Sequence, residues 1–360
     1  MINVLFFIES TDIGGTEQRF VNMANYLAQT GDFDLHFAYI REGVLHQNLN
    51  KTKIKNVQIP LTEKNIPGYF NSGKILAEYI NENNIEIVYS GLIRTDIICF
   101  FSKFFTHFKL FGSLVSCYSM DYIKSSLKNL TEFLLRNFLH IFCYKIISNN
   151  KSGIKNFLFK KKFEYIPNYI SSETVEEIIK SSPAIEKKEN EIILGTLSRL
   201  DEVKNPDVLI KSAELLSFKT DKIVVVCWVG PLGKFDLKKI KGSRIKFLHI
   251  QQHEKRFSYL KSFDICFLVS KREGLSNFLL EAVIAGKPVV ASDCGDSAKV
   301  LPSEISIIVR KSSPELVCEA FYNILSNMPD EKVFEKHKVE FIKRFSLKKT
   351  GDKLVKVLKK

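Results

Sequence analysis

The chain has 360 residues, of which 45% are hydrophobic and 26% are charged, and its formal net charge at pH 7 is +13. Two domains are expected rather than one, because single hydrophobic cores usually stop growing near about 250 residues, and no run reaches the roughly 18 apolar residues that span a bilayer. The basic balance favours an anionic partner such as nucleic acid, a membrane surface or a phosphorylated substrate, although coding bias toward lysine and asparagine is an alternative explanation.

The first predicted element is a strand, INVLFFIES, followed by the loop TDIGGTEQ and the helical pattern RFVNMANYLAQTG. This start lacks a basic region and meets acidic residues at once, so we expect no signal peptide. Short strand candidates separated by helix-like segments follow, which predicts a parallel sheet covered on both faces. These candidates are DLHFAYI, VQIPL, EIVYSG, LFGSLVSC, KIISNN and FEYIPN.

Residues 171–190 are polar, lack a strong apolar face and are predicted to form a linker. The alternation of strands and helices then restarts, so we expect a second doubly wound unit with ligand at the carboxyl ends of its strands. Residues 341–360 have the pattern of a basic amphipathic helix. The strand candidates of the second unit are IILGTLSRL, IVVVCWVG, IKFLHI, DICFLVS, KPVVASD and ISIIV.

The seven cysteines are scattered along the chain, and no CxxC pattern occurs. Several lie inside apolar runs such as DICFLV, which is typical of reduced core residues in a cytosolic protein. We therefore expect neither a disulfide framework nor a zinc site, and a cytoplasmic location.

The stretch SKREGLSNFLLEAVIAGKPVVASDCGD places two glutamates on either side of a helix start. A helix start offers unpaired N–H groups and a partial positive charge, which favour a phosphate. Gly274 lets the backbone approach a ligand closely, and Ser276 or Asn277 can cap the helix. Glu273 and Glu281 can accept hydrogen bonds from hydroxyl groups on both sides of the phosphate, as in a nucleotide sugar. The alternative is that the helix dipole alone favours these acidic residues.

At these residues the sequence resembles the GT-B glycosyltransferases, and within them the large retaining family usually called family 4. Glu273 and Glu281 meet the E-x7-E signature of that family. The resemblance implies an α/β fold of two Rossmann-like doubly wound parallel-sheet domains facing across a cleft. It also implies that Glu273 contacts the donor sugar, that Glu281 contacts the ribose, and that the phosphate side is formed by the backbone of Gly274, Leu275, Ser276 and Asn277.

The segment LGTLSRLDEVKNPDVLIKSAELL resembles the G-R-L-x-x-x-K-N segment of the same family and contains Arg199 and Lys204. Two cations at a strand-to-helix turn can hold a pyrophosphate and neutralise charge on the leaving nucleoside diphosphate, which explains catalysis without a metal ion. A solvated arginine and lysine in a loop is the alternative.

Two weaker matches concern the donor. Gly14 and Gly15 resemble the N-terminal Gly-Gly loop of the family, which faces the donor phosphates. HIQQHE, which includes Ile250, lies where the family holds the nucleobase edge by backbone contacts, with His249 in place of an expected glycine.

The sequence departs from the family where many members carry a histidine near the reacting sugar. The corresponding residues run from Ser116 to Ser119 and contain no histidine, so we expect that Tyr118 or a serine contacts the sugar instead, or that the acceptor supplies the missing contact. We expect His107 and His140 to be packing or surface residues.

Residues 101–162 carry eleven cationic side chains against two acidic ones, a net +9, and aromatic residues lie between them. Such a surface suits anionic lipid headgroups and a lipid-diphosphate-linked acceptor, whereas lysines that are merely solvated are the alternative. Within this region, the helix LTEFLLRNFLHIFCYK is expected to belong to the core rather than to a membrane.

The sequence thus predicts an N-terminal acceptor domain at 1–170, the linker at 171–190, a C-terminal donor domain at 191–340, and a helix at 341–360 that crosses back to the first domain. The expected activity is metal-independent transfer of a hexose-type sugar from a UDP- or GDP-sugar, with retention, to a glycan acceptor in bacterial surface polysaccharide assembly. No other cofactor is expected. We also expect peripheral association with the inner face of the cell membrane. The rival interpretations are a nucleic-acid-binding protein, against which no RRM, KH, helix-turn-helix or zinc pattern appears, and a sugar-nucleotide-binding subunit with weak catalysis.

Overall fold

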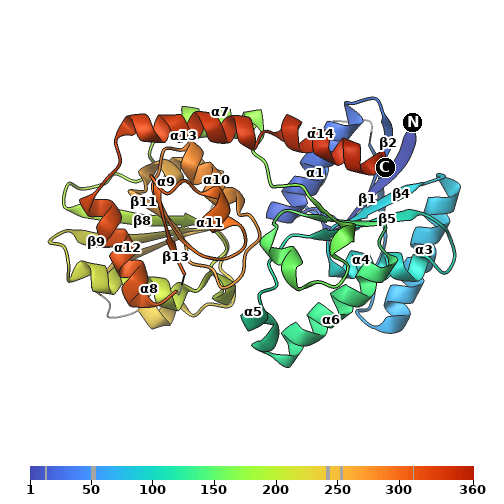
Figure 1. The fold of residues 1–360 in the computed structure, drawn as a ribbon, viewed down its shortest axis with the longest axis horizontal. Helices are drawn as coiled ribbons and strands as arrows, with labels where there is room; N and C mark the ends of the chain where they lie inside the picture. Colours follow the sequence, from blue (N-terminus) through green and yellow to red (C-terminus); the bar gives the residue numbers. More distant parts are fainter. Residues whose placement is uncertain (13, 50–53, 241–243, 252–253, 311) are drawn as a thin grey trace. The chain divides into compact units, whose positions relative to one another are not determined.

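The structure is a computed structural model that describes residues 1–12, 14–49, 54–240, 244–251, 254–310 and 312–360. The chain forms two units (Figure 1), of which unit 1 comprises Met1–Asn168 with Leu347–Lys360 and unit 2 comprises Tyr169–Ser346. Each unit contains one parallel β-sheet with helices packed on it. The α/β class with two doubly wound sheets, predicted from the alternation of strands and helices, is therefore confirmed.

The sheet of unit 1 has seven strands in the order β3-β2-β1-β4-β5-β6-β7. Its inner strand β1 (Ile2–Ser10) is fully buried from Val4 to Ile8, as expected of a strand covered on both faces. The strand order reverses between β1 and β4 (Ile87–Ser90), so the switch point of this sheet lies there. The other strands are β2 (Phe33–Arg41), β3 (Lys55–Gln58), β5 (Lys109–Leu114), β6 (Lys145–Ser148) and β7 (Phe163–Tyr165).

Two long helices of unit 1 begin at side chains that satisfy free backbone N–H groups. Asn65 caps α3 (Ile66–Glu82) by accepting a hydrogen bond from Gly68 N at 2.9 Å, and Ser126 caps α6 (Leu127–Phe142) by accepting one from Asn129 N at 3.2 Å. The other helical segments before residue 169 are α1 (Gly15–Ala28), α2 (His46–Leu49), α4 (Ile93–Ser102), α5 (Met120–Lys124) and the 3₁₀ turns η1 (Ser152–Asn156) and η2 (Lys160–Lys162).

The sheet of unit 2 has six strands in the order β10-β9-β8-β11-β12-β13, and its order reverses between β8 (Glu191–Leu197) and β11 (Ile265–Leu268). The other strands are β9 (Ile223–Val229), β10 (Lys246–Ile250), β12 (Val289–Ser292) and β13 (Ser306–Val309). The helical segments are α7 (Ser172–Lys180), η3 (Glu202–Lys204), α8 (Pro206–Ser217), η4 (Leu237–Ile240), α9 (Arg256–Ser262), α10 (Asn277–Ile284), α11 (Ser297–Val300), α12 (Pro314–Ser326) and α13 (Glu331–Arg344).

The segment predicted as a linker, residues 171–190, lies in unit 2. It contains α7, whose Ile178 is fully buried and which packs against α9 and α10. The turn after α7 is held by Ser262, whose hydroxyl accepts hydrogen bonds from Ala184 N at 2.9 Å and Ile185 N at 3.0 Å. The polar sequence therefore covers unit 2 through three apolar side chains, Val175, Ile178 and Ile185, and through backbone N–H groups bonded to Ser262.

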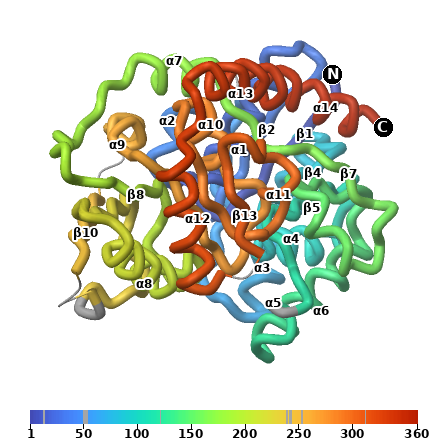
Figure 2. Tube along the Cα trace, turned by 60° about the vertical axis from the view of Figure 1, so that its left-hand side comes forward, coloured from blue at the N-terminus to red at the C-terminus, as the bar shows by residue number. Residues whose placement is uncertain are grey.

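The amphipathic stretch at 341–360 contains the end of α13 and all of α14 (Leu347–Leu358), which belongs to unit 1 and packs against α1 (Figure 2). Gly351 permits this contact, since a Cβ atom there would meet the ring of Tyr26. The Tyr26 hydroxyl donates a hydrogen bond to Asp352 Oδ1 at 2.7 Å, and burial together with this carboxylate raises the pKa of Tyr26 to about 12.

The prediction that α6 belongs to the core is wrong. Seven of its apolar side chains are exposed by more than a third, and its buried residues are Arg136, Asn137, Leu139 and His140. The helix is amphipathic, but the side that faces the interior of unit 1 carries the polar residues Arg136, Asn137 and His140. Periodicity reveals that two faces exist and leaves open which of them faces inward.

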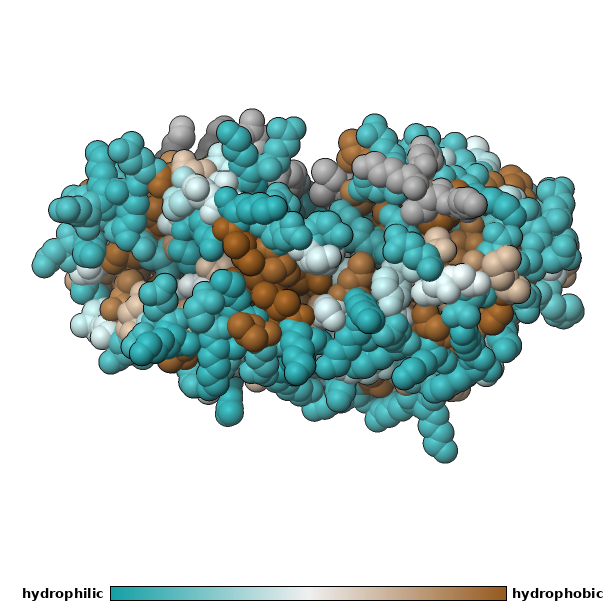
Figure 3. All heavy atoms as spheres, turned by 90° about the horizontal axis from the view of Figure 1, so that it is seen from above, coloured by the Kyte–Doolittle hydropathy of each residue, from teal (hydrophilic) through white to brown (hydrophobic). Residues whose placement is uncertain are grey.

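The composition of the surface agrees with the high charge of the chain, because the face drawn in Figure 3 is mostly hydrophilic with separate hydrophobic areas. Within the described residues, no helix is both long enough and apolar enough to cross a membrane. Five of the seven cysteines are buried, as predicted: Cys99, Cys143, Cys227, Cys266 and Cys318.

Candidate functional site

Two loops meet at the switch point of the unit 2 sheet, where a parallel α/β sheet binds its ligands. One follows β8 and ends in η3, and the other connects β11 to α10. They are joined directly, because Lys271 N donates a hydrogen bond to Val203 O at 2.8 Å. All the predicted site residues from Arg199 to Lys204 and from Glu273 to Asn277 lie on these two loops.

Lys204 and Glu273 form an ion pair across the two loops, with Lys204 Nζ donating to Glu273 Oε1. Ser270 Oγ donates to the same carboxylate oxygen at 3.3 Å. Asp201 fixes the turn that carries the lysine, since its carboxylate accepts hydrogen bonds from Val203 N at 3.1 Å and Lys204 N at 3.3 Å. Both charged side chains stay partly exposed, at 18% and 17%, so an anionic ligand can compete for the ammonium group.

Arg199 lies on the same loop and is mostly exposed, at 64%, with its Nε donating to Asp201 Oδ2 at 2.6 Å. The loop backbone is anchored by Trp228, whose indole N–H donates to Ser198 O at 2.8 Å. The two predicted cations therefore share Asp201 as an orienting group, Lys204 through its backbone and Arg199 through its side chain.

The start of α10 keeps its backbone donors free of side-chain caps. Ser276 occupies the N-cap position without a side-chain hydrogen bond, and Asn277 Oδ1 has no hydrogen-bond partner among the residues that the structure describes. The prediction that one of them caps the helix is therefore wrong. The free N–H groups and the helix dipole form a site that favours an anion beside Lys204.

Glu281 lies in the first turns of α10 and is 4% exposed. Its Oε1 accepts a hydrogen bond from Arg256 Nη2 at 2.7 Å, at the start of α9. Arg256 was not predicted from the sequence. The signal was a lone carboxylate in the apolar run FLLEAV, which requires a cationic partner when it is buried, although the run does not identify that partner.

The loop at Glu273 and Gly274 is supported by the turn after β12, which the sequence analysis also missed. Gly295 has φ +65°, and a Cβ atom there would meet the carbonyl oxygens of both loop residues. Asp296 N donates to Gly274 O at 3.2 Å, and Glu273 N donates to Cys294 Sγ at 2.8 Å. Leu275 anchors the loop with a side chain that is 2% exposed. The sequence contains Glu273-Gly274 and Cys294-Gly295-Asp296, but it does not show that these two turns contact each other.

Gly295→Ala is expected to destabilise unit 2 by about 2–5 kcal/mol, because left-handed backbone strain and a clash with loop carbonyls add together. Gly286→Ala is the matched control, since Gly286 has φ +70° but an added Cβ atom would find only Phe334 Cβ, at 3.9 Å. We expect the control to lose only about 1–2 kcal/mol. Tryptophan-detected urea unfolding measures both, and equal losses would contradict the proposed clash.

Strand β9 is the neighbour of β8 in the sheet, and it ends beside β10 at the same carboxyl edge. Gly230 N donates to Ile250 O at 2.8 Å, and His249 Nε2 lies 2.9 Å from Gly230 O. The imidazole thus ties the two strand ends together where a glycine was expected. Ile250 is partly buried, while Gln252 and His253 of the HIQQHE segment lie outside the described residues.

Gly14 and Gly15 lie at the switch point of unit 1, where α1 begins after β1. Gly14 is the N-cap residue and provides no side-chain cap. A Cβ atom at Gly15 would meet nothing within 4 Å, and one at Gly14 would meet only the side chain of Glu17. Packing within the described structure therefore does not require Gly15.

The expectation that Tyr118 contacts a sugar is wrong, because its side chain is 1% exposed and its hydroxyl donates to Glu132. Ser119 caps α5 by accepting a hydrogen bond from Tyr122 N at 3.2 Å. His140 is buried and His107 is exposed, as expected of packing and surface residues. Among the described residues, no group of three or more His, Cys, Asp or Glu side chains is arranged to hold a metal ion.

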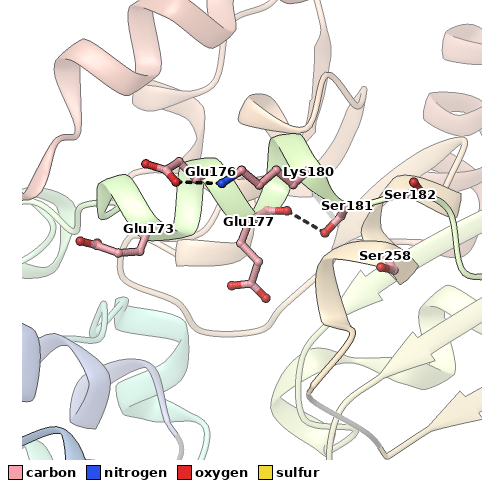
Figure 4. A pocket seen from close by; sticks show the side chains of 7 residues that line it. All are labelled: Glu173, Glu176, Glu177, Lys180, Ser181, Ser182 and Ser258. Carbon is pink, nitrogen blue, oxygen red and sulfur yellow. Dashed lines mark hydrogen bonds and ion pairs between the residues drawn. The ribbon is translucent and has the colours of Figure 1, made fainter.

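A separate depression lies beside α7 in unit 2 (Figure 4). Among the described residues that line it, Lys180 is the one cation and pairs with Glu176 at 3.2 Å, while Ser181 Oγ donates to Glu177 O at 2.7 Å. The excess of glutamate makes it unsuitable for a diphosphate, and it includes none of the predicted site residues. Its lining residues are Glu173, Glu176, Glu177, Lys180, Ser181, Ser182 and Ser258.

Comparison with known proteins points to the same unit. Residues 191–327 match the family described as Glycosyl transferases group 1. An uncharacterized glycosyltransferase of Methanocaldococcus jannaschii is 28% identical over 216 residues, which are 58% of this chain and 55% of that protein. A protein of Campylobacter jejuni named N-acetylgalactosamine-N,N'-diacetylbacillosaminyl-diphospho-undecaprenol 4-alpha-N-acetylgalactosaminyltransferase is 25% identical over 229 residues, 61% of this chain and 60% of that one. The match thus spans little more than half of the length of these two curated relatives.

Solved structures extend the likeness to both units. The structure of Anabaena Alr3699/HepE in complex with UDP superposes with a TM-score of 0.77 over 99% of this chain and 100% of the other, at 15% identity. The chain has the GT-B fold. The matched residues 191–327 lie in unit 2 and include both loops of the candidate site.

Proposed function

We propose that the chain transfers a sugar from a nucleotide-sugar donor to an acceptor hydroxyl, with retention at the anomeric carbon. The observation that carries the proposal is the pairing of Lys204 with Glu273 beside the uncapped start of α10. This arrangement places a cation, free N–H groups and a carboxylate at one switch point, which matches the phosphate and hydroxyl groups of such a donor. The family match over residues 191–327 supports the reaction class.

In the proposed reaction the bond between the anomeric carbon and the phosphate oxygen breaks, and its electron pair stays on the leaving nucleoside diphosphate. The acceptor oxygen bonds to the anomeric carbon, and the acceptor proton moves to the leaving phosphate. Lys204, Arg199 and the N–H groups of α10 stabilise the charge that develops on the phosphate, so no metal ion is required. Retention rests on the resemblance to the retaining family.

Donor binding is assigned residue by residue. We propose that Glu273 leaves its lysine partner to accept hydrogen bonds from sugar hydroxyl groups when the phosphate takes Lys204. Glu281, held in place by Arg256, accepts hydrogen bonds from the ribose. The phosphates lie on the backbone of Gly274, Leu275, Ser276 and Asn277. The donor-binding role of Gly14 and Gly15 stays a prediction from the resemblance. Ile250 contacts the base edge through its backbone.

The donor is proposed to be a UDP- or GDP-sugar, and the acceptor a glycan of bacterial surface polysaccharide assembly. Complexes of Anabaena HepE with UDP and with UDP-glucose support a uridine nucleotide. The name of the Campylobacter relative, which contains diphospho-undecaprenol, supports a lipid-linked acceptor. A peripheral location on the inner face of the cell membrane follows from such an acceptor.

A thermal-shift panel of UDP, GDP, ADP, CMP and their common sugar conjugates tests the proposal. One nucleoside diphosphate is expected to raise the melting temperature of the wild type, because a ligand at about 100 times its Kd adds about 2.7 kcal/mol of stability. The double variant Arg199→Ala with Lys204→Ala is expected to lose this shift, whereas Lys211→Ala on α8, which is exposed away from both loops, retains it. The absence of a shift with every nucleotide would overturn the proposal.

A further inference from the structure

Helix α6 carries an apolar stripe on its solvent-exposed side. Leu127, Leu130, Leu134, Phe138 and Ile141 recur every three or four residues, and each is between 39% and 77% exposed. This spacing places them on one side of a helix. Leucine and phenylalanine residues exposed singly are ordinary on a protein surface, but a contiguous apolar stripe marks an interaction site.

Polar contacts on the other side hold this orientation. The buried Arg136 guanidinium lies 3.9 Å from Asp96 of α4 and 3.4 Å from Glu132. Asn137 Oδ1 accepts a hydrogen bond from Leu158 N at 3.1 Å. Rotating α6 to bury its stripe would break these contacts and leave the buried Asp96 carboxylate without its cationic partner Arg136, which costs several kcal/mol.

The apolar surface continues onto the end of α4. The ring of Phe100 lies 5.4 Å from that of Phe138 and 4.8 Å from that of Phe142, and it also contacts Phe104 at 5.3 Å. Phe104 is 65% exposed. We call this surface, made of the α6 stripe with Phe104 and Phe142, the α6 face.

Lysines lie at both ends of the α6 face. Lys124 and Lys128 are exposed at the start of the helix, and Lys160 and Lys161 are exposed on η2. The position of η2 is fixed by its third lysine, Lys162, whose Nζ donates to the carbonyl oxygens of His140, Ile141 and Cys143 at the end of α6. The acidic residue of the helix, Glu132, is turned inward toward Tyr118 and Arg136.

We propose that the α6 face docks on an anionic lipid bilayer, with the apolar stripe in the interfacial region and the lysines on lipid phosphates. An apolar stripe flanked by cations matches a surface that is anionic outside and apolar beneath. A second copy of the chain fits less well, since a symmetric contact would bring the same lysines together in a protein of net charge +13. The inference deepens the proposed function, on which it rests only for the idea that the acceptor is lipid-linked.

Cosedimentation of the full chain with vesicles tests the docking. We expect binding to vesicles of phosphatidylcholine with phosphatidylglycerol and much weaker binding to phosphatidylcholine alone. The triple variant Leu134→Ser, Phe138→Ser and Ile141→Ser is expected to lower the partition coefficient at least about tenfold, because it removes most of the inserted apolar area. A matched control replaces Ile66, Phe218 and Val339, which are 64–74% exposed elsewhere, with serine and is expected to bind like the wild type.

A second variant separates the electrostatic contribution. Replacing Lys124, Lys128, Lys160 and Lys161 with glutamine is expected to weaken binding to the anionic vesicles and to reduce its salt dependence. Circular dichroism melts verify that each variant is folded. The proposal is overturned if the wild type and the serine triple variant bind the vesicles equally. It is also overturned if the wild type binds no vesicles but forms a dimer that the triple variant does not form. Neither result bears on sugar transfer, because the vesicle assay needs no donor or acceptor.

Discussion

Lys204→Ala is expected to lower the turnover of the nucleotide-sugar donor by about 10²- to 10³-fold, the usual loss when one preorganised group that stabilises transition-state charge is removed. The ammonium group is the cation that the structure holds between the η3 turn and the loop before α10. Release of nucleoside diphosphate from the donor found in the thermal-shift panel measures the effect.

Two control variants separate the effect of the Lys204 ammonium group from other causes of lost turnover. Lys211→Ala removes an equal charge from α8 and is expected to leave turnover unchanged. Glu273→Gln keeps the shape of the pair without its charge, so it separates loss of the sugar contact from loss of the phosphate contact. If Lys204→Ala and Lys211→Ala have the same turnover, the phosphate site does not lie at this lysine.

His140→Phe is expected to make unit 1 more resistant to acid than the wild type, by about 2 kcal/mol at pH 5. Burial, together with the nearby Arg136 and Lys162 charges, lowers the pKa of His140 to about 3. The unfolded chain binds a proton near pH 6.5 and the folded chain does not until about pH 3. The wild type therefore loses stability as pH falls through this interval, and phenylalanine removes the loss.

The same change is expected to be neutral or mildly stabilising at pH 7.5. Both ring nitrogens of His140 lack hydrogen-bond partners among the described residues, and its ring packs between Phe157 and Phe163 at centroid distances of 5.0 and 5.5 Å. Trp228 lies in unit 2, so hydrogen exchange of amides in β5 and β6 is the appropriate measurement for unit 1. His107→Asn, at an exposed position, is the control. A wild type and His140→Phe variant that lose protection in parallel between pH 7.5 and 5 would contradict the prediction.

The fold was predictable because strands buried on both faces are continuous apolar runs. VLFFI in β1 and VVVCWV in β9 have no polar side to confuse their assignment. Helix α6 was not predictable in the same way, since its inward-facing Arg136 depends on Asp96, which lies forty residues away. The sequence contains both charges but not the contact that makes burial of the arginine tolerable.

In the candidate site, too, residues within local motifs were predictable, whereas contacts between distant segments were not. Glu273, Lys204 and the helix start at Ser276 were found from local motifs, and the sheet order brings their loops together. Their mutual ion pair was not foreseen, because the sequence motifs assign each residue to the ligand and not to the other residue. Arg256 and Gly295 act through contacts made only after folding, so no local pattern identifies them.

The placement of α14 has a consequence for how the protein is made. Unit 2 is one uninterrupted stretch of chain, whereas unit 1 requires its last helix from the far end of the sequence. During synthesis, which adds about 5–20 residues per second, the α1 surface around Tyr26 is made before all of unit 2 and its partners Gly351 and Asp352 after all of unit 2. Unit 1 therefore begins before unit 2 and is completed after it, and its α1 surface stays uncovered by α14 while unit 2 is being made.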